Sequence, residues 1–384
     1  MSASAEDRGD RFARVALSAL CEPGNAELSD LVAAHGVVEA LERLLCGEAS
    51  STLVRGAEAR LGGRDVADVV SALERIAETC QARVIVPDDP EWPARVDDLA
   101  VLCDEADPHT RPPICLWTRG RGDLAEALSR SASIVGAREC TAYGRHVATE
   151  LAFGLANRDW TVVSGGAYGV DAAAHRGALA GGGLTVAVLA CGVDRPYPAC
   201  NAGLFDSIVD TGFLVSEWPP GSTPQRRRFL VRNRVIAAAT SGTVVVEAGL
   251  RSGARHTVRR AWELDRPVMI VPGPVTSEAS AGVHQLARGP GETRIVTRAE
   301  EIVEDLGRLG ADLAPPLHSP DGPRDRLNSS EAQILDAVPR RVGAAVERIA
   351  AQAGLPAAEA RRVLPNLAAR GLIERRDDRY RLAS

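Results

Sequence analysis

The chain has 384 residues, of which 45% are hydrophobic and 25% are charged, and its formal net charge is −6. This composition is ordinary for a globular protein long enough for two or three domains, and the mild acidity argues against a protein that coats DNA indiscriminately. No apolar run is long enough to cross a bilayer, and the first residues lack the apolar core of a signal peptide. We therefore expect a cytoplasmic protein without a membrane segment.

All 45 basic side chains are arginine. The planar guanidinium group suits phosphates and can stack on nucleic-acid bases. One local basic groove is compatible with a negative total charge, because binding responds to local charge. The eight cysteines are scattered without a C-x-x-C pair, which argues against a metal cluster or a redox motif.

Residues 1–81 are expected to form a module of small helices, of a SAM or helix-hairpin type. In the stretch LSDLVAAHGVVEALERLL, residues 28–45, apolar side chains recur near helical spacing. Ser29 or Asp30 is the expected N-cap of this segment, and Gly36 is expected to break it.

Residues 82–307 are predicted to form a Rossmann-like, doubly wound α/β domain with a mostly parallel sheet. Short Val/Ile/Leu runs that end in glycine turns alternate with helix-like segments, which is typical of strands buried on both faces. The clearest runs are ASIVGAREC, WTVVSGGAYGVD, LTVAVLACG, GFLVSEW, GTVVVEAG and PVMIVPG. Ligands of such sheets bind at the carboxyl ends of the strands, where these glycine turns fall.

Residues 308–328 are rich in Pro, Asp and Gly, which predicts a linker. Residues 329–384 are predicted to form a winged helix-turn-helix domain, with three helices and a hairpin that turns near Asp377 and Asp378. Pro365 interrupts the last of these helices and is expected to kink or shorten it.

That proline argues against base reading in a DNA groove by the last helix. The arginines near it could still contact phosphates. They are Arg361, Arg362, Arg375 and Arg376.

One glycine turn, VSGGAYGVD at residues 163–171, resembles a phosphate-cradling loop. Ser164 precedes Gly165, Gly166 and Gly169, whose backbones permit a tight turn and the close approach of an anion. An alternative remains open, in which the glycines only allow close packing of the strand on the following helix. No Walker lysine is possible in this chain.

Two other strand ends supply further candidates for an anion site. Arg138 stands beside Gly136 at the end of the first parallel strand, from which its side chain can reach the crevice. Ser252 and Gly253 follow the strand in GTVVVEAG.

The stretch TPQRRRFLVRNR, residues 223–234, surrounds an apolar core with arginines. We expect Arg232 and Arg234 to face the phosphate crevice. Phe229 and Val231 are expected to anchor the segment against the sheet or to stack near a base.

No catalytic residue, metal ligand or cofactor is predicted. Asp171 and His175 stand four residues apart on an expected helix and could pair, but no nucleophile elbow and no metal-ligand spacing accompanies them. We interpret Asp171 as a helix cap with His175 as its partner. Glu217 and Glu247, both at strand ends, are interpreted as structural partners for the arginines of the RNR segment.

The order of motifs between Ser133 and Gly289 closely resembles the DNA processing protein A family, also called Smf. The motifs are SIVGAR, VSGGAYGVDAAAH, AVLACGVDRPYPACN, LVSEWPPG, RRFLVRNRVIA, VVVEAGLRSGARHT, VPGPV and SAGVHQLARG. The resemblance implies a homodimer that binds and protects single-stranded DNA and loads the RecA recombinase onto it, as in natural transformation. It implies no catalytic activity.

Carried over by motif, the resemblance implies a set of DNA-binding residues. They are Arg138, the loop with Ser164, Gly165, Gly166, Tyr168 and Gly169, then Asn201 in the YPxxN motif, and Arg232 and Arg234 in the RNR motif. Ser252 and Gly253, at their strand end, complete the set of expected DNA-binding residues. Tyr168 stands where the family often carries a basic residue, and its ring offers a surface on which a base could stack.

Two other functions remain as alternatives. One is a nucleotide-processing hydrolase of the lysine-decarboxylase-like, cytokinin-activating type, although its PGGxGTxxE loop has no match here. The other is a transcription regulator in which the winged helix reads duplex DNA and the α/β domain senses a nucleotide.

Overall fold

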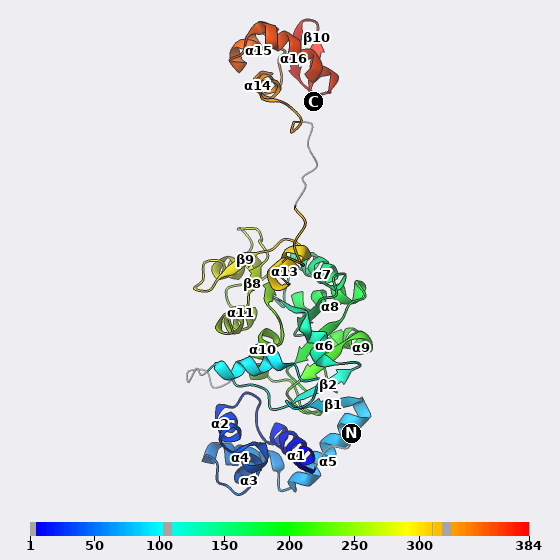
Figure 1. Ribbon diagram of the computed structural model, residues 1–384, viewed down its shortest axis with the longest axis vertical. Coiled ribbons are helices and arrows are strands. Elements are labelled where there is room, and N and C mark those ends of the chain that lie inside the picture. Colours follow the sequence, from blue (N-terminus) through cyan, green and yellow to red (C-terminus); the bar gives the residue numbers. More distant parts are fainter. Residues whose placement is uncertain (1–4, 103–109, 309, 317–323, 384) are drawn as a thin grey trace. The chain divides into compact units, whose positions relative to one another are not determined.

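The computed structural model describes residues 5–102, 110–308, 310–316 and 324–383. Residues 1–314 form one compact unit and residues 315–384 form a second (Figure 1). Part of the predicted linker, at residues 309 and 317–323, lies outside the described residues. Among the described residues, no helix is both long enough and apolar enough to cross a membrane.

The first unit is built around one sheet whose strands run in the spatial order β1-β2-β6-β5-β4-β3-β7-β8-β9. The strands are β1 (Ala82–Ile85), β2 (Leu116–Gly120), β3 (Ser131–Val135), β4 (Thr161–Ser164), β5 (Thr185–Leu189), β6 (Phe213–Ser216), β7 (Thr243–Val245), β8 (Val268–Ile270) and β9 (Thr293–Ile295). The seven strands from β3 to β9 pair with one another in parallel. Strands β1 and β2 add an antiparallel edge next to β6. The predicted Rossmann-like, mostly parallel sheet is confirmed.

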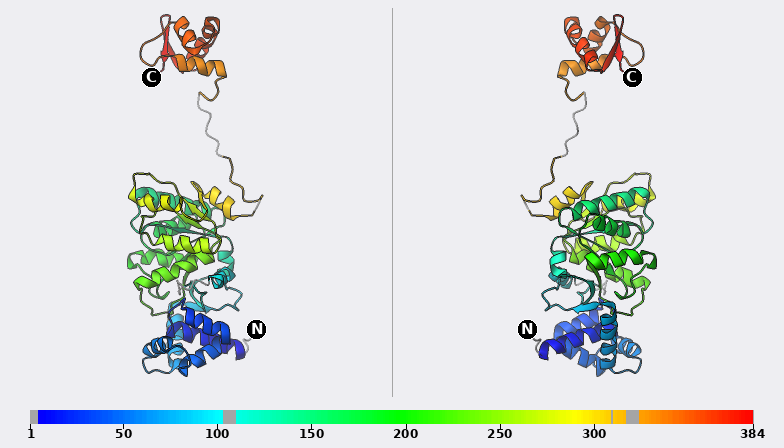
Figure 2. Two further views of the ribbon diagram at one scale, coloured as in Figure 1. Left: turned by 90° about the vertical axis from the view of Figure 1, so that its left-hand side faces the viewer. Right: turned by 90° about the vertical axis from the view of Figure 1, so that its right-hand side faces the viewer.

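Helices cover both faces of this sheet (Figures 1 and 2). They are α6 (Leu124–Ser129), α7 (Ala142–Ala156), α8 (Val170–Ala180), α9 (Ala202–Thr211), α10 (Arg226–Ala239), α11 (Ala254–Glu263), α12 (Glu278–Leu286) and α13 (Ala299–Leu306). Successive strand residues point to opposite faces. Ile134 of β3 packs in one core with residues of α7, α8 and α13, while its neighbour Val135 packs in another with residues of α10 and α11.

The N-terminal helices are α1 (Ala5–Leu20), α2 (Ala26–His35), α3 (Val37–Leu45), α4 (Ser51–Leu61) and α5 (Val66–Cys80). Gly36 separates α2 from α3 with a φ of 78°, so the predicted break is confirmed. The N-cap of α2 is Asn25, whose side chain accepts a hydrogen bond from the Leu28 N–H. The expected caps, Ser29 and Asp30, lie inside the helix, because it begins one turn earlier than the apolar spacing indicated.

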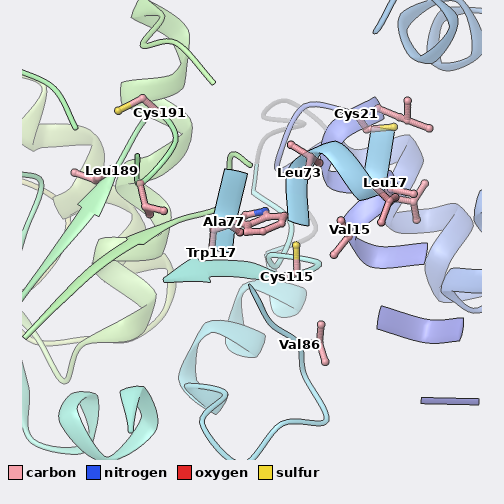
Figure 3. Packing of buried hydrophobic residues seen from close by; sticks show 14 of the residues in the cluster. Val15, Leu17, Cys21, Leu73, Ala77, Val86, Cys115, Trp117, Leu189 and Cys191 are labelled. Carbon is pink, nitrogen blue, oxygen red and sulfur yellow. The ribbon is translucent and has the colours of Figure 1, made fainter. Parts of the chain in front are cut away.

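These helices share a hydrophobic core with the antiparallel edge of the sheet. Leu17 of α1 and Leu73 and Ala77 of α5 belong to the same buried cluster as Cys115 and Trp117 (Figure 3). The N-terminal helices therefore shield the antiparallel edge of the sheet from solvent.

Glu22, just after α1, joins the N-terminal helices to α10. One of its carboxylate oxygens accepts hydrogen bonds from Arg60 of α4 and from Arg228 of α10, the latter at 2.7 Å. The other oxygen accepts from the Trp218 indole N–H at 3.0 Å, and the Arg228 guanidinium lies 5.6 Å from the centroid of that ring. Although burial opposes ionisation, the hydrogen bonds from Arg228 and Trp218 hold the pKa of Glu22 below its ordinary value.

Glu22→Gln is expected to lower the free energy of unfolding by about 1–2 kcal/mol, because it weakens charge-assisted hydrogen bonds between two parts of the unit. Glu39→Gln is a matched control, since Glu39 pairs with Arg43 at i,i+4 on an exposed helix face and should contribute less than about 0.5 kcal/mol. Urea unfolding of both variants measures the difference. Equal losses would show that Glu22 does not join the two parts.

The second unit is a winged helix with its own core. It contains α14 (Ser329–Ala337), α15 (Val346–Ala353), α16 (Ala357–Ala369) and a hairpin of β10 (Ile373–Arg376) and β11 (Arg379–Leu382). The helices pack around a buried cluster that includes Ile349, Leu364 and Leu367. Pro365 does not end α16, which runs on to Ala369, because its neighbours Leu364 and Leu367 are held in this core.

Candidate nucleic-acid interface

An open groove of about 1140 Å³ lies at the carboxyl end of β3. Strands β4, β5 and β6 extend the sheet to one side of β3, and β7 starts again on its other side, so this is the point where the strand order reverses. Ligands of open α/β sheets bind at such switch points. Small-molecule pockets usually hold about 300–1,000 Å³, so an open groove above that range suits an extended ligand.

The groove is lined by segments that follow β3, β4, β5 and β7, by one side of α10 and by the start of α12. The lining residues include Gly136, Arg138, Glu139, Ala167, Asp171, Tyr197, Gln225, Arg226, Phe229, Leu230, Arg232, Asn233, Arg251, Ser252, Gly253, His256, Thr257 and Glu278. Both acidic and basic side chains are present, and the arginines come from three separate segments.

The glycine loop between β4 and α8 is tightly packed on its surroundings. A Cβ atom at Gly169, whose φ is 75°, would lie 2.3 Å from the Ala137 carbonyl oxygen, and one at Gly165 would lie 2.3 Å from the Arg232 guanidinium. Ser164 is fully buried and its hydroxyl donates to the Ile134 carbonyl at 2.6 Å. The packing role that the sequence left open for these glycines is therefore present in the structure.

Asp171 occupies the position at which the loop was expected to receive an anion. Its carboxylate accepts hydrogen bonds from the Gly165 N–H at 3.1 Å and the Ala167 N–H at 3.4 Å. Burial raises the pKa of Asp171, while Arg232 and these two N–H groups oppose that shift. The Asp171 side chain therefore holds backbone N–H groups of the glycine loop and does not cap α8, whose N-cap is Gly169.

Arg232 and Asn201 hold the same loop by its carbonyl groups. Arg232 is only 4% exposed, and it donates hydrogen bonds to the Gly165 carbonyl at 2.8 Å and to the Val188 carbonyl. Burial lowers the pKa of Arg232 to about 10, an effect that Asp171 opposes. Asn201, also 4% exposed, donates to the Gly166 carbonyl at 3.1 Å. Both side chains thus position the loop, and Arg232 also borders the groove.

The expectation that Arg234 faces the crevice is wrong. Its guanidinium is 1% exposed and forms a two-pronged ion pair with Glu217, with one bond at 2.7 Å. Its remaining Nε–H donates to the Arg111 carbonyl at 2.9 Å. The interpretation of Glu217 as a structural partner of the RNR segment is confirmed, and its partner is Arg234.

The other arginines of this stretch point in different directions because the whole segment is helical. Arg226 lines the groove, and Arg228 pairs with Glu22 on the other side of α10. Arg227 is exposed and lines a separate hollow on the surface, which Glu22 also lines. Only part of the arginine cluster therefore faces the groove.

The exposed Arg138 and the half-buried Phe229 form a stack in the groove. The Arg138 guanidinium lies 4.9 Å from the centroid of the Phe229 ring, and Tyr197 meets that ring edge-on at 5.9 Å. Arg138 is exposed to solvent, and Tyr168 beside the glycine loop is 46% exposed. Such pairs of a cation and aromatic rings are the surface on which a base can stack next to a neutralised phosphate.

The predicted site residues fall into three groups in the structure. Arg138, Arg232, Ser252 and Gly253 line the groove; Ser164, Gly165, Gly166, Tyr168, Gly169 and Asn201 form or brace the adjacent loop; and Arg234 lies in its buried ion pair. Ser252 accepts a hydrogen bond from the Ala254 N–H at the start of α11. The sequence reasoning missed Tyr197, Arg251 and His256, although Arg251 stands next to a predicted residue.

The candidate acid and base side chains are all engaged in structural contacts. Glu247 accepts hydrogen bonds from the Thr141 N–H at 2.8 Å and hydroxyl at 2.6 Å, so it fixes the start of α7 and does not pair with an arginine of the RNR segment. His175 pairs with the Thr185 hydroxyl at 2.7 Å and not with Asp171. Among the described residues, no group of three or more His, Cys, Asp or Glu side chains could hold a metal ion.

We expect His175 to make the stability of the protein depend on pH in mild acid. Burial, with Arg232 and Arg176 nearby, lowers the pKa of His175 from 6.5 to about 3. Between these values the unfolded chain binds a proton that the native state does not, so stability falls as the pH falls below 6.5. This one group should contribute about 1.4 kcal/mol per pH unit.

We therefore expect the wild type to lose roughly 2 kcal/mol more than His175→Gln when the pH is changed from about 7 to about 5. Urea unfolding at the two pH values measures this, with His146→Gln at an exposed position of α7 as the matched control. The same pH dependence in wild type and His175→Gln would contradict the assignment.

The fold and the groove together define a Rossmann-like α/β protein whose ligand site sits at the switch point of its sheet, followed by a winged helix. A family model described as DNA recombination-mediator protein A matches residues 83–307. The chain belongs to this family of DNA recombination mediators, as its motif order indicated. A model described as the IclR helix-turn-helix domain matches residues 332–377, which confirms the predicted winged helix.

Individual relatives support the same membership. The chain is 46% identical over 367 residues to the DNA processing protein DprA of Mycobacterium tuberculosis, covering 95% of this chain and 92% of that one. It is 36% identical over 194 residues to DNA processing protein DprA of Streptococcus pneumoniae, covering 50% and 67% of the two chains. The X-ray structure of the S. pneumoniae protein matches with a TM-score of 0.62 and 25% identity, over 80% of this chain and 100% of that one.

Proposed function

We propose that this recombination mediator binds single-stranded DNA in the groove at the end of β3 and loads RecA onto it, acting as a homodimer in the cytoplasm. The observation that carries this proposal is the exposed Arg138, held 4.9 Å from the centroid of the Phe229 ring inside an open groove. A flexible single strand can present a phosphate to the guanidinium and a base to the neighbouring ring at the same time.

The other lining residues support a sequence-tolerant mode of binding. Arg226 and Arg251 add positive charge on two further sides of the groove, and Tyr197 extends its aromatic surface. Phosphate contacts and stacking do not depend on base identity, because every base has a flat face and every nucleotide carries a phosphate. Arg232, the glycine loop and Asn201 then act as the rigid support for the groove.

A role without catalysis is part of the proposal. The candidate acids and bases, Asp171, His175 and Glu247, are held by hydrogen bonds within the protein. We assign the domains as the N-terminal helical module 1–81, the DNA-binding domain 82–307, the linker 308–328 and the winged helix 329–384. The shared core between the N-terminal helices and the sheet supports a structural role for the first of these.

Binding of fluorescent oligo-dT and of a duplex at two salt concentrations tests the proposal. We expect tighter binding of the single strand, with an affinity that falls as salt rises by a log–log slope of about −0.7 per phosphate contacted. RecA assembly on the same oligo-dT, with and without the protein, and sedimentation of the free protein test the partner and the dimer. A preference for duplex by the groove, or binding that salt does not change, would overturn the proposal.

A further inference from the structure

Positive charge is concentrated in the winged-helix unit. Residues 324–383 contain twelve arginines and eight carboxylate side chains, a net charge of +4 in a chain whose total is −6. A local excess of arginine on an otherwise acidic protein is the electrostatic signature of an anionic partner. The arrangement of these arginines indicates which face of the unit such a partner meets.

The arginines on and beside α16 are neutralised within the unit. Arg361 pairs with Glu347 of α15 at 2.6 Å, Arg362 lies 3.9 Å from Glu359, and Arg370 lies 3.5 Å from Glu331. Each of these guanidinium groups would have to leave or share a carboxylate to bind a phosphate. A helix-turn-helix domain normally places its last helix, here α16, in the major groove. In this unit the arginines of that helix are offset by carboxylates, so its face carries less free positive charge than the hairpin side.

The hairpin side of the unit carries arginines without such partners. Arg340 and Arg341 lie between α14 and α15, and Arg376 and Arg379 lie on the hairpin. The two segments are joined where Ala344 pairs with Tyr380 through backbone hydrogen bonds of 3.0 and 2.9 Å. We call these four exposed arginines the wing patch; within residues 324–383, no carboxylate lies within ion-pairing distance of any of them.

Two members of the wing patch face each other across the hairpin. Arg376 and Arg379 are direct cross-strand partners in the register of β10 and β11. Like charges in directly opposite positions destabilise a strand pair. Of the two acidic residues in the turn, Asp378 pairs with Arg375, whose guanidinium also lies near the Tyr380 ring. A bound phosphate between the two arginines would relieve their repulsion.

We infer that the wing patch, and not α16, contacts the phosphate backbone of duplex DNA. The patch has no exposed aromatic side chain within residues 324–383, since Tyr380 is 5% exposed, so it lacks the stacking surface that favours single strands. Its contacts are to phosphates, which makes them independent of sequence. The winged helix thereby adds a duplex-binding surface to a chain whose other DNA site is the groove.

The test compares two variants of the full chain that each remove three positive charges. Arg340→Ala/Arg341→Ala/Arg376→Ala removes most of the wing patch, while Arg361→Ala/Arg362→Ala/Arg370→Ala removes the paired arginines of α16. Arg379 is kept because it also donates to the Gly343 carbonyl. Fluorescence anisotropy with a duplex of mixed sequence and with oligo-dT is measured over a range of salt concentrations.

We expect the wing-patch variant to bind duplex about ten-fold more weakly, with a salt slope reduced by about 0.9 per lost contact. The α16 variant should keep its duplex affinity within about two-fold, since a neighbouring carboxylate already offsets the charge of each of its three arginines. Oligo-dT affinity should change little in either variant, which separates this inference from the proposed function of the groove.

Three results would overturn the inference. They are a duplex affinity unchanged in the wing-patch variant, an equal or larger loss in the α16 variant, and a matching loss for oligo-dT. Because all four wing-patch side chains are exposed, the wing-patch variant should melt no earlier than the wild type by circular dichroism, and a lowered melting temperature would equally count against a patch that only binds DNA.

Discussion

Arg234→Ala is expected to lower the free energy of unfolding by about 3–5 kcal/mol, because it leaves the buried Glu217 carboxylate without its partner. The two side chains are 1% and 4% exposed, and Arg234 also satisfies the Arg111 carbonyl. Urea unfolding followed by circular dichroism measures the loss. Single-strand affinity of the fraction that remains folded should stay close to that of the wild type.

The double variant Arg234→Met/Glu217→Leu distinguishes a structural role of the ion pair from a role of Arg234 in DNA binding. Replacing a buried ion pair by apolar side chains of similar size is often neutral or stabilising, so the double variant should recover much of the stability lost in Arg234→Ala. A folded and stable Arg234 variant with weakened oligo-dT binding would instead assign Arg234 to the DNA site, as the motif suggested.

Arg138→Ala and Phe229→Ala are expected to have the largest effects on single-strand binding. Loss of the ring should cost about 1–3 kcal/mol of binding free energy if a base stacks there. Loss of the guanidinium should make the log–log salt slope less negative by about 0.7. Since Arg138 lies over the Phe229 ring, the two effects should not add in the double variant.

Fluorescence anisotropy with oligo-dT measures all three variants. Arg75→Ala, which removes an exposed arginine of α5 outside the groove lining, is the control for total charge. If Arg138→Ala matches the Arg75 control in both affinity and salt slope while the protein remains folded, the groove is not the DNA site.

The sheet could be predicted from the sequence because its strands are apolar runs that end in glycine turns. The direction of Arg232 and Arg234 could not, and the reason is geometric. Both were expected in the crevice, but α10 begins at Arg226, and residues two apart on a helix point about 200° away from each other. Recognising VRNRVIAAA as the continuation of one helix would have placed the two arginines on opposite sides.

The contacts of Asp171 and His175 were also beyond the reach of spacing rules. Their separation of four residues fits a helical pair, yet Asp171 turns back to the glycine loop and His175 turns to Thr185 on β5. Both partners are fixed by the packing of α8 on the sheet. In the same way, the pairing of Arg361 with Glu347 depends on how α16 packs on α15, so sequence alone could not separate neutralised arginines from available ones.

The groove is assembled from segments that are far apart along the chain, and this affects when it can exist during synthesis. Its lining begins at Val135 and is completed by Glu278 and Ala279 at α12. A nascent chain that stops before α12 therefore carries the arginines of α10 without the complete groove. Since domains generally fold as units as they emerge, a ribosome-bound chain should acquire the affinity of the complete groove for single strands late and in one step, after α12 has been synthesised.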